Sequence, residues 1–413
     1  ETNSARSYHK RIKASFVKPR VYCFRVFYHP SNVRIEMRPS ILSLFGLLLL
    51  SLSVAAGEPV VFVSAFKSGE EGAIHAFRFD TQTGSLKPLN QSTGIGQPFF
   101  MALSPNGQFL YAIDTDQFGG DQDEWIAAYA VEGETGKLTR LNRQSARGTA
   151  SCYLDVDASG KSVVVANYAS GSVAALPVRE DGSLKEAASF IQHKGSSVDP
   201  KRQKGPFAHS IVISPDNRFA LAADLGLDKV LIYRFDAANG KLVANDEQPF
   251  LDLPPGSGPR HLTFDPSGNR VYVINELKNT VTYFTYAADS GRLTLQQTIS
   301  TLPEGFSGTS HCADLKITPD GQFLYGTNRG HDSIAIYRIG SDGRLNRVGI
   351  KSSLGGGPQN LLITPDGRWL LCANMTGNNV RVFRIDSKNG GLTANGDPVS
   401  VSMPACLRWL PAT

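Results

Sequence analysis

The sequence predicts an all-β fold: a seven-bladed β-propeller with four antiparallel strands per blade, closed by pairing of the N- and C-terminal strands. Three observations lead to this prediction. A strand–turn–strand unit recurs every 46 to 57 residues, and a second pair of apolar strands follows each unit. The two ends of the repeat region each contain one part of a seventh unit. A repeat of about 50 residues with strand content is typical of a propeller and not of a helical solenoid.

The clearest copy of the unit joins Leu262–Phe264 to Val271–Ile274 through the turn Pro266-Ser267-Gly268. Both runs have the β-branched and aromatic bias of strands, and proline followed by glycine is turn chemistry. In an antiparallel hairpin the start of the first strand lies beside the end of the second, so polar residues should gather at the edge opposite the turn. These residues are Arg260, His261, Asn275 and Glu276.

The same turn recurs in five further units. The copies are Ser104–Gly107, Asp157–Gly160, Ser214–Asn217, Thr318–Gly321 and Thr364–Gly367. After each hairpin comes an apolar run and a turn ending in Gly-x-Leu or a close variant, which adds two strands and makes four per unit. These second halves are Ile126–Leu141, Ser172–Lys185, Lys229–Leu242, Thr280–Leu293, Ser333–Leu345 and Asn379–Leu392.

The ends of the repeat region complete a seventh unit. Ala73–Leu86 is a second half preceded only by the lone strand Val60–Val63, and Met403–Leu410 is an opening strand with nothing after it. We therefore expect the two terminal strands to pair in one composite blade. Such closure hides two sheet edges that would otherwise favour aggregation.

The composition fits one large β domain as well as two smaller ones, with 413 residues, 41% hydrophobic, 40 Gly and 23 Pro. The formal charge of +5 comes from the N-terminal region, since residues beyond 56 hold 33 Lys/Arg and 35 Asp/Glu. A nearly neutral domain without a basic stripe disfavours nucleic-acid binding.

The N-terminal region has the features of an export signal. Met37-Arg38 precedes the apolar run Ile41–Val54 and the small residues Ala55-Ala56-Gly57. This pattern predicts a secretory signal peptide at 37–56, and the run is too short and serine-interrupted for a confident membrane span. We expect 1–36 to be a disordered upstream extension without function and 57–413 to be the exported propeller, periplasmic or extracellular. An uncleaved membrane anchor or a cytoplasmic protein is the alternative.

Four of the five cysteines fall in the propeller region: Cys152, Cys312, Cys372 and Cys406. Their wide spacing excludes a zinc ribbon and a small disulfide framework. A Cys372–Cys406 bridge between neighbouring blades is one interpretation. Buried free thiols are the interpretation we favour.

Aligning the units on their turns turns the polar edge of one hairpin into a ring of positions. The place of Asn275 holds Asp114, Asn167, Asp224, Asn328 and Asn374, and short polar residues of this kind end strands by bonding nearby backbone. We favour that structural role for Asn167, Asn328 and Asn374. The place of Arg260 holds His209 and Gln359, and the place of His261 holds Ser210, Asp314 and Asn360.

Departures from the repeat are more informative about function. Glu276 and Arg329 insert opposite charges where other units hold Thr, Tyr, Leu or Met, and His209 adds a titratable base. Clustered charges of this kind mark a candidate site at the mouth of the channel, with a structural salt-bridge network as the alternative.

Several chemistries lack their residues. The chain has no Gly-x-Ser-x-Gly, His-Glu-x-x-His or Cys-x-x-Cys motif, which disfavours serine-hydrolase and zincin activity. The glycine run Gly355–Gly357 has no following helix to bind an anion, so we interpret it as a flexible entry to a blade. The acidic residues Asp116, Asp121, Asp123 and Glu124 resemble a calcium ligand set without EF-hand spacing, and we interpret them as a solvated loop.

Together the repeats and these residues resemble the seven-bladed lactonase family, which includes propeller-type 6-phosphogluconolactonases and fungal carboxy-muconate lactonizing enzymes. The similarity spans about residues 59–411. The matching pieces are Ala208-His209-Ser210, Gly258-Pro259-Arg260-His261, Asn275-Glu276-Leu277, Pro303–Ser307, Ala313-Asp314-Leu315 and Asn328-Arg329.

The resemblance implies a lactone hydrolase whose cleft carries four catalytic residues, His209, Arg260, Glu276 and Arg329. His261 and Asp314 lie alongside them, and Asn167, Gln359 and Asn360 complete the predicted substrate-binding set. We expect attack of water on a sugar δ-lactone, with His209 or Glu276 as base, no metal and no cofactor. The export signal is a departure, because phosphogluconolactone is a cytoplasmic metabolite.

Three alternatives stay open at this point: a non-catalytic exported propeller that binds a ligand or protein at the same face, a muconate-type lactonizing enzyme, and a metal-dependent lactonase. We further expect a monomer whose partner is a small-molecule lactone, with no stable membrane span once the signal is removed. Fold alone does not fix any of these functions.

Overall fold

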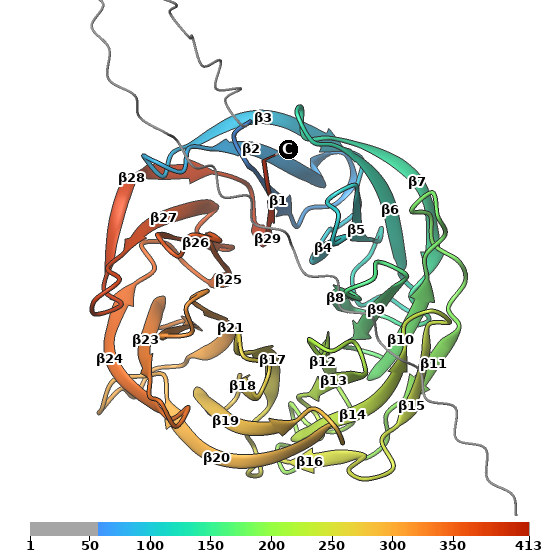
Figure 1. Cartoon of the computed structure of the whole chain (residues 1–413), viewed down its shortest axis with the longest axis vertical. Helices are drawn as coiled ribbons and strands as arrows, with labels where there is room; N and C mark the ends of the chain where they lie inside the picture. Colours follow the sequence, from blue (N-terminus) through green and yellow to red (C-terminus); the bar gives the residue numbers. More distant parts are fainter. Residues whose placement is uncertain (1–56, 413) are drawn as a thin grey trace, which may run out of the picture. The chain divides into compact units, whose positions relative to one another are not determined.

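The computed structural model describes residues 57–412, so the predicted extension at 1–36 and signal peptide at 37–56 lie outside the described residues. Residues 57–412 form seven β-sheets around a central axis (Figure 1). This confirms the predicted seven-bladed propeller. Within the described residues, no helix is long and apolar enough to cross a membrane.

Six sheets are each built from one continuous stretch of chain, and their strands run in sequence order from the channel outward. They are β4 (Met101–Leu103), β5 (Phe109–Asp114), β6 (Trp125–Glu132), β7 (Lys137–Ser145); β8 (Ser151–Val156), β9 (Ser162–Asn167), β10 (Ser172–Pro177), β11 (Ser189–Gln192); β12 (Ala208–Ile213), β13 (Phe219–Asp224), β14 (Lys229–Asp236), β15 (Lys241–Ala244); β17 (Pro259–Phe264), β18 (Arg270–Asn275), β19 (Thr280–Ala287), β20 (Arg292–Ser300); β21 (His311–Ile317), β22 (Phe323–Arg329), β23 (Ser333–Ile339), β24 (Leu345–Ser352); and β25 (Pro358–Ile363), β26 (Trp369–Asn374), β27 (Asn379–Ile385), β28 (Leu392–Ser400). A short additional strand, β16 (Phe250–Asp252), pairs with β14, and a 3-10 turn covers Gly69–Glu71.

The seventh sheet is the expected composite of both chain ends. It runs in the order β29 (Pro404–Leu410), β1 (Val60–Ala65), β2 (Ala73–Phe79) and β3 (Leu86–Thr93). The register places Val60 opposite Leu410. Figure 1 shows β29, in red, beside β1, in blue. The N- and C-terminal strands therefore close the ring through a shared sheet, as predicted.

The core lies between adjacent blades. Every residue of β9 and of β13 is buried, whereas the outermost strand β20 is largely exposed, because each sheet packs on two neighbours near the axis and faces water at the rim. Tyrosine hydroxyls join the blades near the rim. The hydroxyl of Tyr272 donates to the carbonyl of Gly343 at 2.7 Å, and that of Tyr325 donates to Gly390 at 2.9 Å.

The four cysteines of the described chain are all free and buried. The alternative of a Cys372–Cys406 bridge is therefore not realised, and the buried-thiol interpretation holds. Burial also raises the pKa of the Cys372 thiol, which makes it a poor nucleophile at neutral pH.

Candidate active site

A β-bulge recurs at one position of the innermost strands, next to the polar edge. The register of β17 with β18 shifts between Pro259 and His261, so Arg260 has no partner across the sheet. An extra residue of this kind re-aims side chains, and Nη1 of Arg260 comes to lie 3.1 Å from Nε2 of His261, its neighbour in sequence. The same shift skips Cys152, His209 and Gln359 in β8, β12 and β25.

Glu276, directly after β18, lies at the centre of the charged cluster. Its Oε2 is 3.1 Å from Nε of Arg260 and 2.8 Å from Nη2 of Arg329, and its Oε1 is 2.6 Å from Nη2 of Arg202. Burial alone would raise the pKa of Glu276, but Arg329, Arg260 and Arg202 together lower it to about 2. Glu276 is therefore a carboxylate at neutral pH, and a weak base.

The two predicted arginines differ in exposure. Arg260 is fully buried, and burial, with the repulsion of Arg329, lowers its pKa to about 10. Its Nη1 donates to the carbonyl of Ala313 at 2.5 Å. The side chain of Arg329 is 27% exposed, and it donates to the carbonyl of Cys312 at 3.0 Å and to Oε1 of Gln359 at 3.3 Å. Both guanidinium groups stay cationic at neutral pH, and Arg329 is the one that solvent or a ligand can reach.

Arg202 is the site residue that the sequence reasoning missed. It lies in the connection between β11 and β12, outside the repeated strand–turn–strand units, so aligning the turns could not reveal it. The signal that could have found it is local. Lys201, Arg202 and Lys204 form the densest group of basic residues in the propeller region, just ahead of His209.

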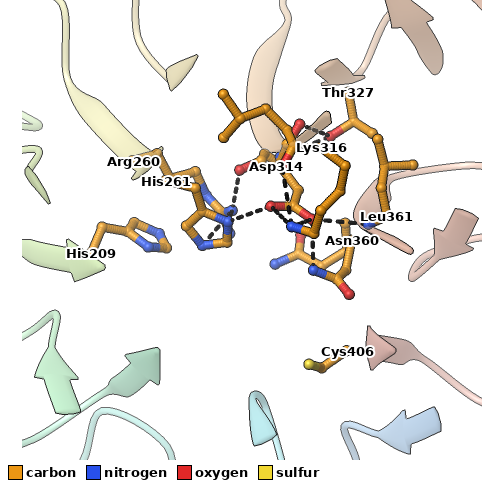
Figure 2. Close-up of polar contacts among 12 residues, drawn as sticks. His209, Arg260, His261, Asp314, Lys316, Thr327, Asn360, Leu361 and Cys406 are labelled. Carbon is orange, nitrogen blue, oxygen red and sulfur yellow. Dashed lines mark hydrogen bonds and ion pairs between the residues drawn. The ribbon is translucent and has the colours of Figure 1, made fainter. Parts of the chain in front are cut away.

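A second polar network links neighbouring blades within the channel (Figure 2). Nδ1 of His261 is 2.9 Å from Oδ1 of Asp314, and Oδ2 of Asp314 accepts from Nδ2 of Asn360 at 2.7 Å and from Nζ of Lys316 at 2.8 Å. Burial and the charge of Arg260 lower the pKa of His261 to about 3, so the ring is neutral. In the tautomer that these contacts favour, Nδ1–H donates to Asp314 and Nε2 accepts from Arg260.

His209 lies beside His261, on the side away from Asp314 (Figure 2). The two ring centroids are 5.4 Å apart, and the ring of Tyr168 is 5.2 Å from His209. Burial, followed by the charge of Arg260, holds the pKa of His209 well below its ordinary value. His209 is therefore a neutral imidazole, with Nδ1 3.5 Å from Sγ of Cys152 and with no hydrogen bond to Nε2 from residues 57–412.

A cavity of about 510 Å³ adjoins this cluster. Of the predicted site residues, Glu276, Arg329 and Gln359 line this cavity, whereas His209 and Arg260 lie outside its lining. The remaining lining residues are Thr309, His311, Gly330, Asp332, Gly357, Met375 and Thr376. Hydroxyl, carboxylate and imidazole groups around a pocket of this size suit a polar, sugar-sized ligand.

Other predicted residues lie apart from the cluster. Asn167 is fully buried. Its Oδ1 accepts a hydrogen bond from the hydroxyl of Ser151, and its Nδ2 donates to the hydroxyl of Ser172 and to the carbonyl of Ala146. This is the strand-ending role favoured for it. The structure does not bring Asn167 to the cavity. Asn360 is also fully engaged, since its Oδ1 accepts from the amide of Leu407.

The acidic loop is only partly the solvated loop that we expected. Glu124 is buried, and its carboxylate oxygens accept hydrogen bonds from the backbone N–H groups of Gly119, Ala150 and Ser151, with N–O distances of 2.7–2.9 Å. These bonds attach the loop to the next blade. Among the described residues, no group of three or more His, Cys, Asp or Glu has the geometry of a metal site.

The fold is that of a closed β-propeller with a polar site on its axis. The site consists of a carboxylate bound by arginines and a neutral histidine. The family model described as "Lactonase, 7-bladed beta-propeller" matches residues 60–409, and the chain belongs to this family.

Similar proteins of known sequence or structure agree with this assignment. A 6-phosphogluconolactonase of Bacillus subtilis is 33% identical over 84% of this chain and 97% of its own length. A structure of a putative 6-phosphogluconolactonase from Bacteroides fragilis superposes with a TM-score of 0.80 at 34% identity, covering 87% of this chain and 99% of that one. The periplasmic gluconolactonase PpgL of Pseudomonas aeruginosa has a TM-score of 0.80 at 33% identity, covering 86% and 99%.

Proposed function

We propose that the protein hydrolyses a sugar δ-lactone related to 6-phosphogluconolactone or gluconolactone. The observation that carries the proposal is the placement of Glu276 between Arg260 and Arg329, at the wall of a sugar-sized cavity and near the neutral His209. The names of the relatives in Bacillus subtilis and Pseudomonas aeruginosa support a lactone as substrate.

In the proposed reaction His209 is the general base. It takes a proton from a water molecule while the water oxygen bonds to the lactone carbonyl carbon. The ring C–O bond then breaks, and the leaving oxygen takes the proton back from His209, which releases a hydroxy acid. Nε2 of His209 accepts no hydrogen bond from residues 57–412 and can accept a proton, whereas both oxygens of Glu276 are already bound by arginines.

The guanidinium groups have a different role in this scheme. Charge develops on the carbonyl oxygen during attack, and Arg329 can donate to it because its side chain is partly exposed at the cavity. Glu276 keeps Arg329 and the buried Arg260 in place through its Oε2. The scheme uses protein groups and water alone, with no metal or cofactor.

We also propose that the chain is cleaved after Ala56 and exported, with residues 57–413 as the working domain. The apolar run after Met37 supports this, as does the similarity to a protein named as a periplasmic gluconolactonase. Sequencing the N-terminus of protein recovered from outside the cytoplasm tests the processing site.

The decisive experiment is a lactone panel assayed on residues 57–413 by pH-stat, with glucono-δ-lactone and its 6-phosphate above the spontaneous rate. We expect hydrolysis that EDTA leaves unchanged. Binding without hydrolysis would instead indicate a non-catalytic propeller, and loss of activity in EDTA a metal-dependent lactonase. Lactone formation from a muconate would indicate a lactonizing enzyme.

Two histidine variants test the assignment of the base. His209→Gln should lower kcat by about 10²- to 10⁴-fold, the usual contribution of a general base. His311→Gln is the matched variant, because His311 lines the cavity while His209 does not. If His311→Gln loses this activity and His209→Gln keeps it, the base is His311 and the proposed role of His209 is wrong.

A further inference from the structure

Arg202 reaches the site from a connection between two blades and not from a repeated strand. We call residues 193–207, between β11 and β12, the arginine arm. Its Arg202 binds Oε1 of Glu276 at 2.6 Å, while the strand-borne Arg260 and Arg329 bind Oε2. The carboxylate of Glu276 is thus bound by Arg260 of its own blade, by Arg329 of the next blade and by Arg202 of the arginine arm.

Buried hydrogen bonds attach the arginine arm to the blade that follows it in sequence, β12–β15. The side chain of His193 is fully buried, with Nδ1 2.6 Å from Asp224 and Nε2 2.8 Å from the hydroxyl of Tyr233. Gln203, next to Arg202, is fully buried and donates from Nε2 to the carbonyl of Leu225 at 2.8 Å. Buried, satisfied polar contacts on both sides of Arg202 preorganise its guanidinium group.

Arg202 also contacts the histidine side of the site. Burial raises the pKa of Tyr168, and a hydrogen bond to Arg202 opposes that rise. The Tyr168 ring packs 5.2 Å from His209 and 4.9 Å from Phe207, the last residue of the arm. Arg202 therefore connects Glu276 with the aromatic support of the proposed base.

We propose that Arg202 is a positioning residue for lactone hydrolysis. It binds Oε1 of Glu276 while the strand-borne arginines bind Oε2, and so fixes the geometry in which Glu276 presents Arg329 to the cavity. This inference rests on the proposed function, since it concerns the same site.

The charged and titratable groups around Glu276 determine how such a role can be measured. They are Arg202 on the arm, Arg260 on β17, Arg329 on β22, Tyr168 after β9, Cys152 on β8, and Cys312 and His311 on β21. Only the three arginines are cations that hold the pKa of Glu276 down. Removing Arg202 should therefore raise that pKa toward its ordinary value.

The kinetic test compares Arg202→Ala and Arg202→Lys with the control Lys201→Gln. Lys201 is exposed on the same arm, so the control removes the same charge without touching Glu276. We expect Arg202→Ala to lower kcat by about 10²-fold with little change in KM, as misplacement of a site group does. Free guanidinium ion should restore part of the activity of Arg202→Ala, and Arg202→Lys should retain part of it.

A second readout does not depend on catalysis. A carboxylate with a lowered pKa stabilises the fold above its ordinary pKa, and this stability is lost as the pH falls toward the lowered value. The stability deficit of Arg202→Ala relative to Lys201→Gln should therefore be largest above pH 5 and narrow as the pH falls from about 4.5 toward 2. Urea unfolding across this range measures it.

The outcomes separate the two proposals. If the wild-type protein hydrolyses no lactone, the proposed function fails, while the pH-dependent stability gap still tests the link between Arg202 and Glu276. A kcat of Arg202→Ala equal to that of Lys201→Gln overturns the positioning role. So does a loss of kcat without guanidinium rescue and with a pH-independent gap, because a mere packing residue would behave in that way.

Discussion

At the scale of single residues, Glu276 connects stability with function. Its two oxygens bind three guanidinium groups, one of which, Arg260, is fully buried. A buried ion pair contributes little over an apolar pair of the same shape, but removing one partner leaves the other charge uncompensated. The carboxylate is therefore required by its neighbours as much as by any substrate.

Substituting Glu276 by Gln should abolish lactone hydrolysis and also lower the free energy of unfolding by about 3 kcal/mol, because Arg260 then lacks its counter-charge. Urea unfolding and the pH-stat assay measure both effects. Glu247→Gln, at an exposed position, is the control. Hydrolysis within tenfold of the parent rate would contradict the proposed role.

At the scale of the structural elements, the hairpin turns show why the blades could be predicted. In three of them a hydroxyl bonds the aspartate two residues on, as Thr364 Oγ1 does to Asp366 at 2.5 Å, and the fourth residue has a positive φ. The Ser/Thr-Pro-Asp-Gly sequence alone predicts these local contacts. In one turn Asn217, with φ 63°, takes the place of glycine.

Replacing Gly367, with φ 69°, should therefore depend on the new side chain. Gly367→Ala should lower the free energy of unfolding by about 1 kcal/mol, because alanine disfavours the left-handed region. Gly367→Asn should lower it less, as the natural Asn217 turn indicates. Chemical denaturation of the two variants measures the difference. Equal losses would show that crowding, and not the backbone angle, limits this position.

The site was less predictable than the blades, for a physical reason. His209, Arg260, Glu276 and Arg329 fall in register with the repeat, so aligning the turns places them at one edge. The residues Pro259–Phe264 predict a strand, but not the register shift that turns Arg260 onto His261. Arg202 lies in a connection outside the repeated units, and no periodicity points to its contact with Glu276.

At the scale of the whole molecule, the propeller depends on a sheet shared by both ends of the described chain. β29 pairs with β1 over most of its length, and Val60 lies opposite Leu410. Without β29, the edge of β1 would be open and the ring would have a gap beside β25 and β4.

Deleting residues 404–413 should therefore abolish cooperative unfolding and cause aggregation. A circular permutant that joins 412 to 57 through a short glycine-containing linker, with new ends in the outer turn at 387–390, should fold, because the joined ends already lie side by side. Circular dichroism melting and size-exclusion chromatography test both variants, and the permutant should elute as a monomer. A soluble, cooperatively melting deletion variant would show that the shared sheet is dispensable.

The shared sheet also sets an order of events in the life of the chain. A ribosome makes β1 before the other strands of the propeller and β29 after them, so the first sheet waits for residues 404–410. The other six sheets can form before β29 is made, yet the circle stays open until β29 is available. For a protein that we propose to be exported, this late closure leaves time for the transport machinery to bind the chain before the propeller is complete.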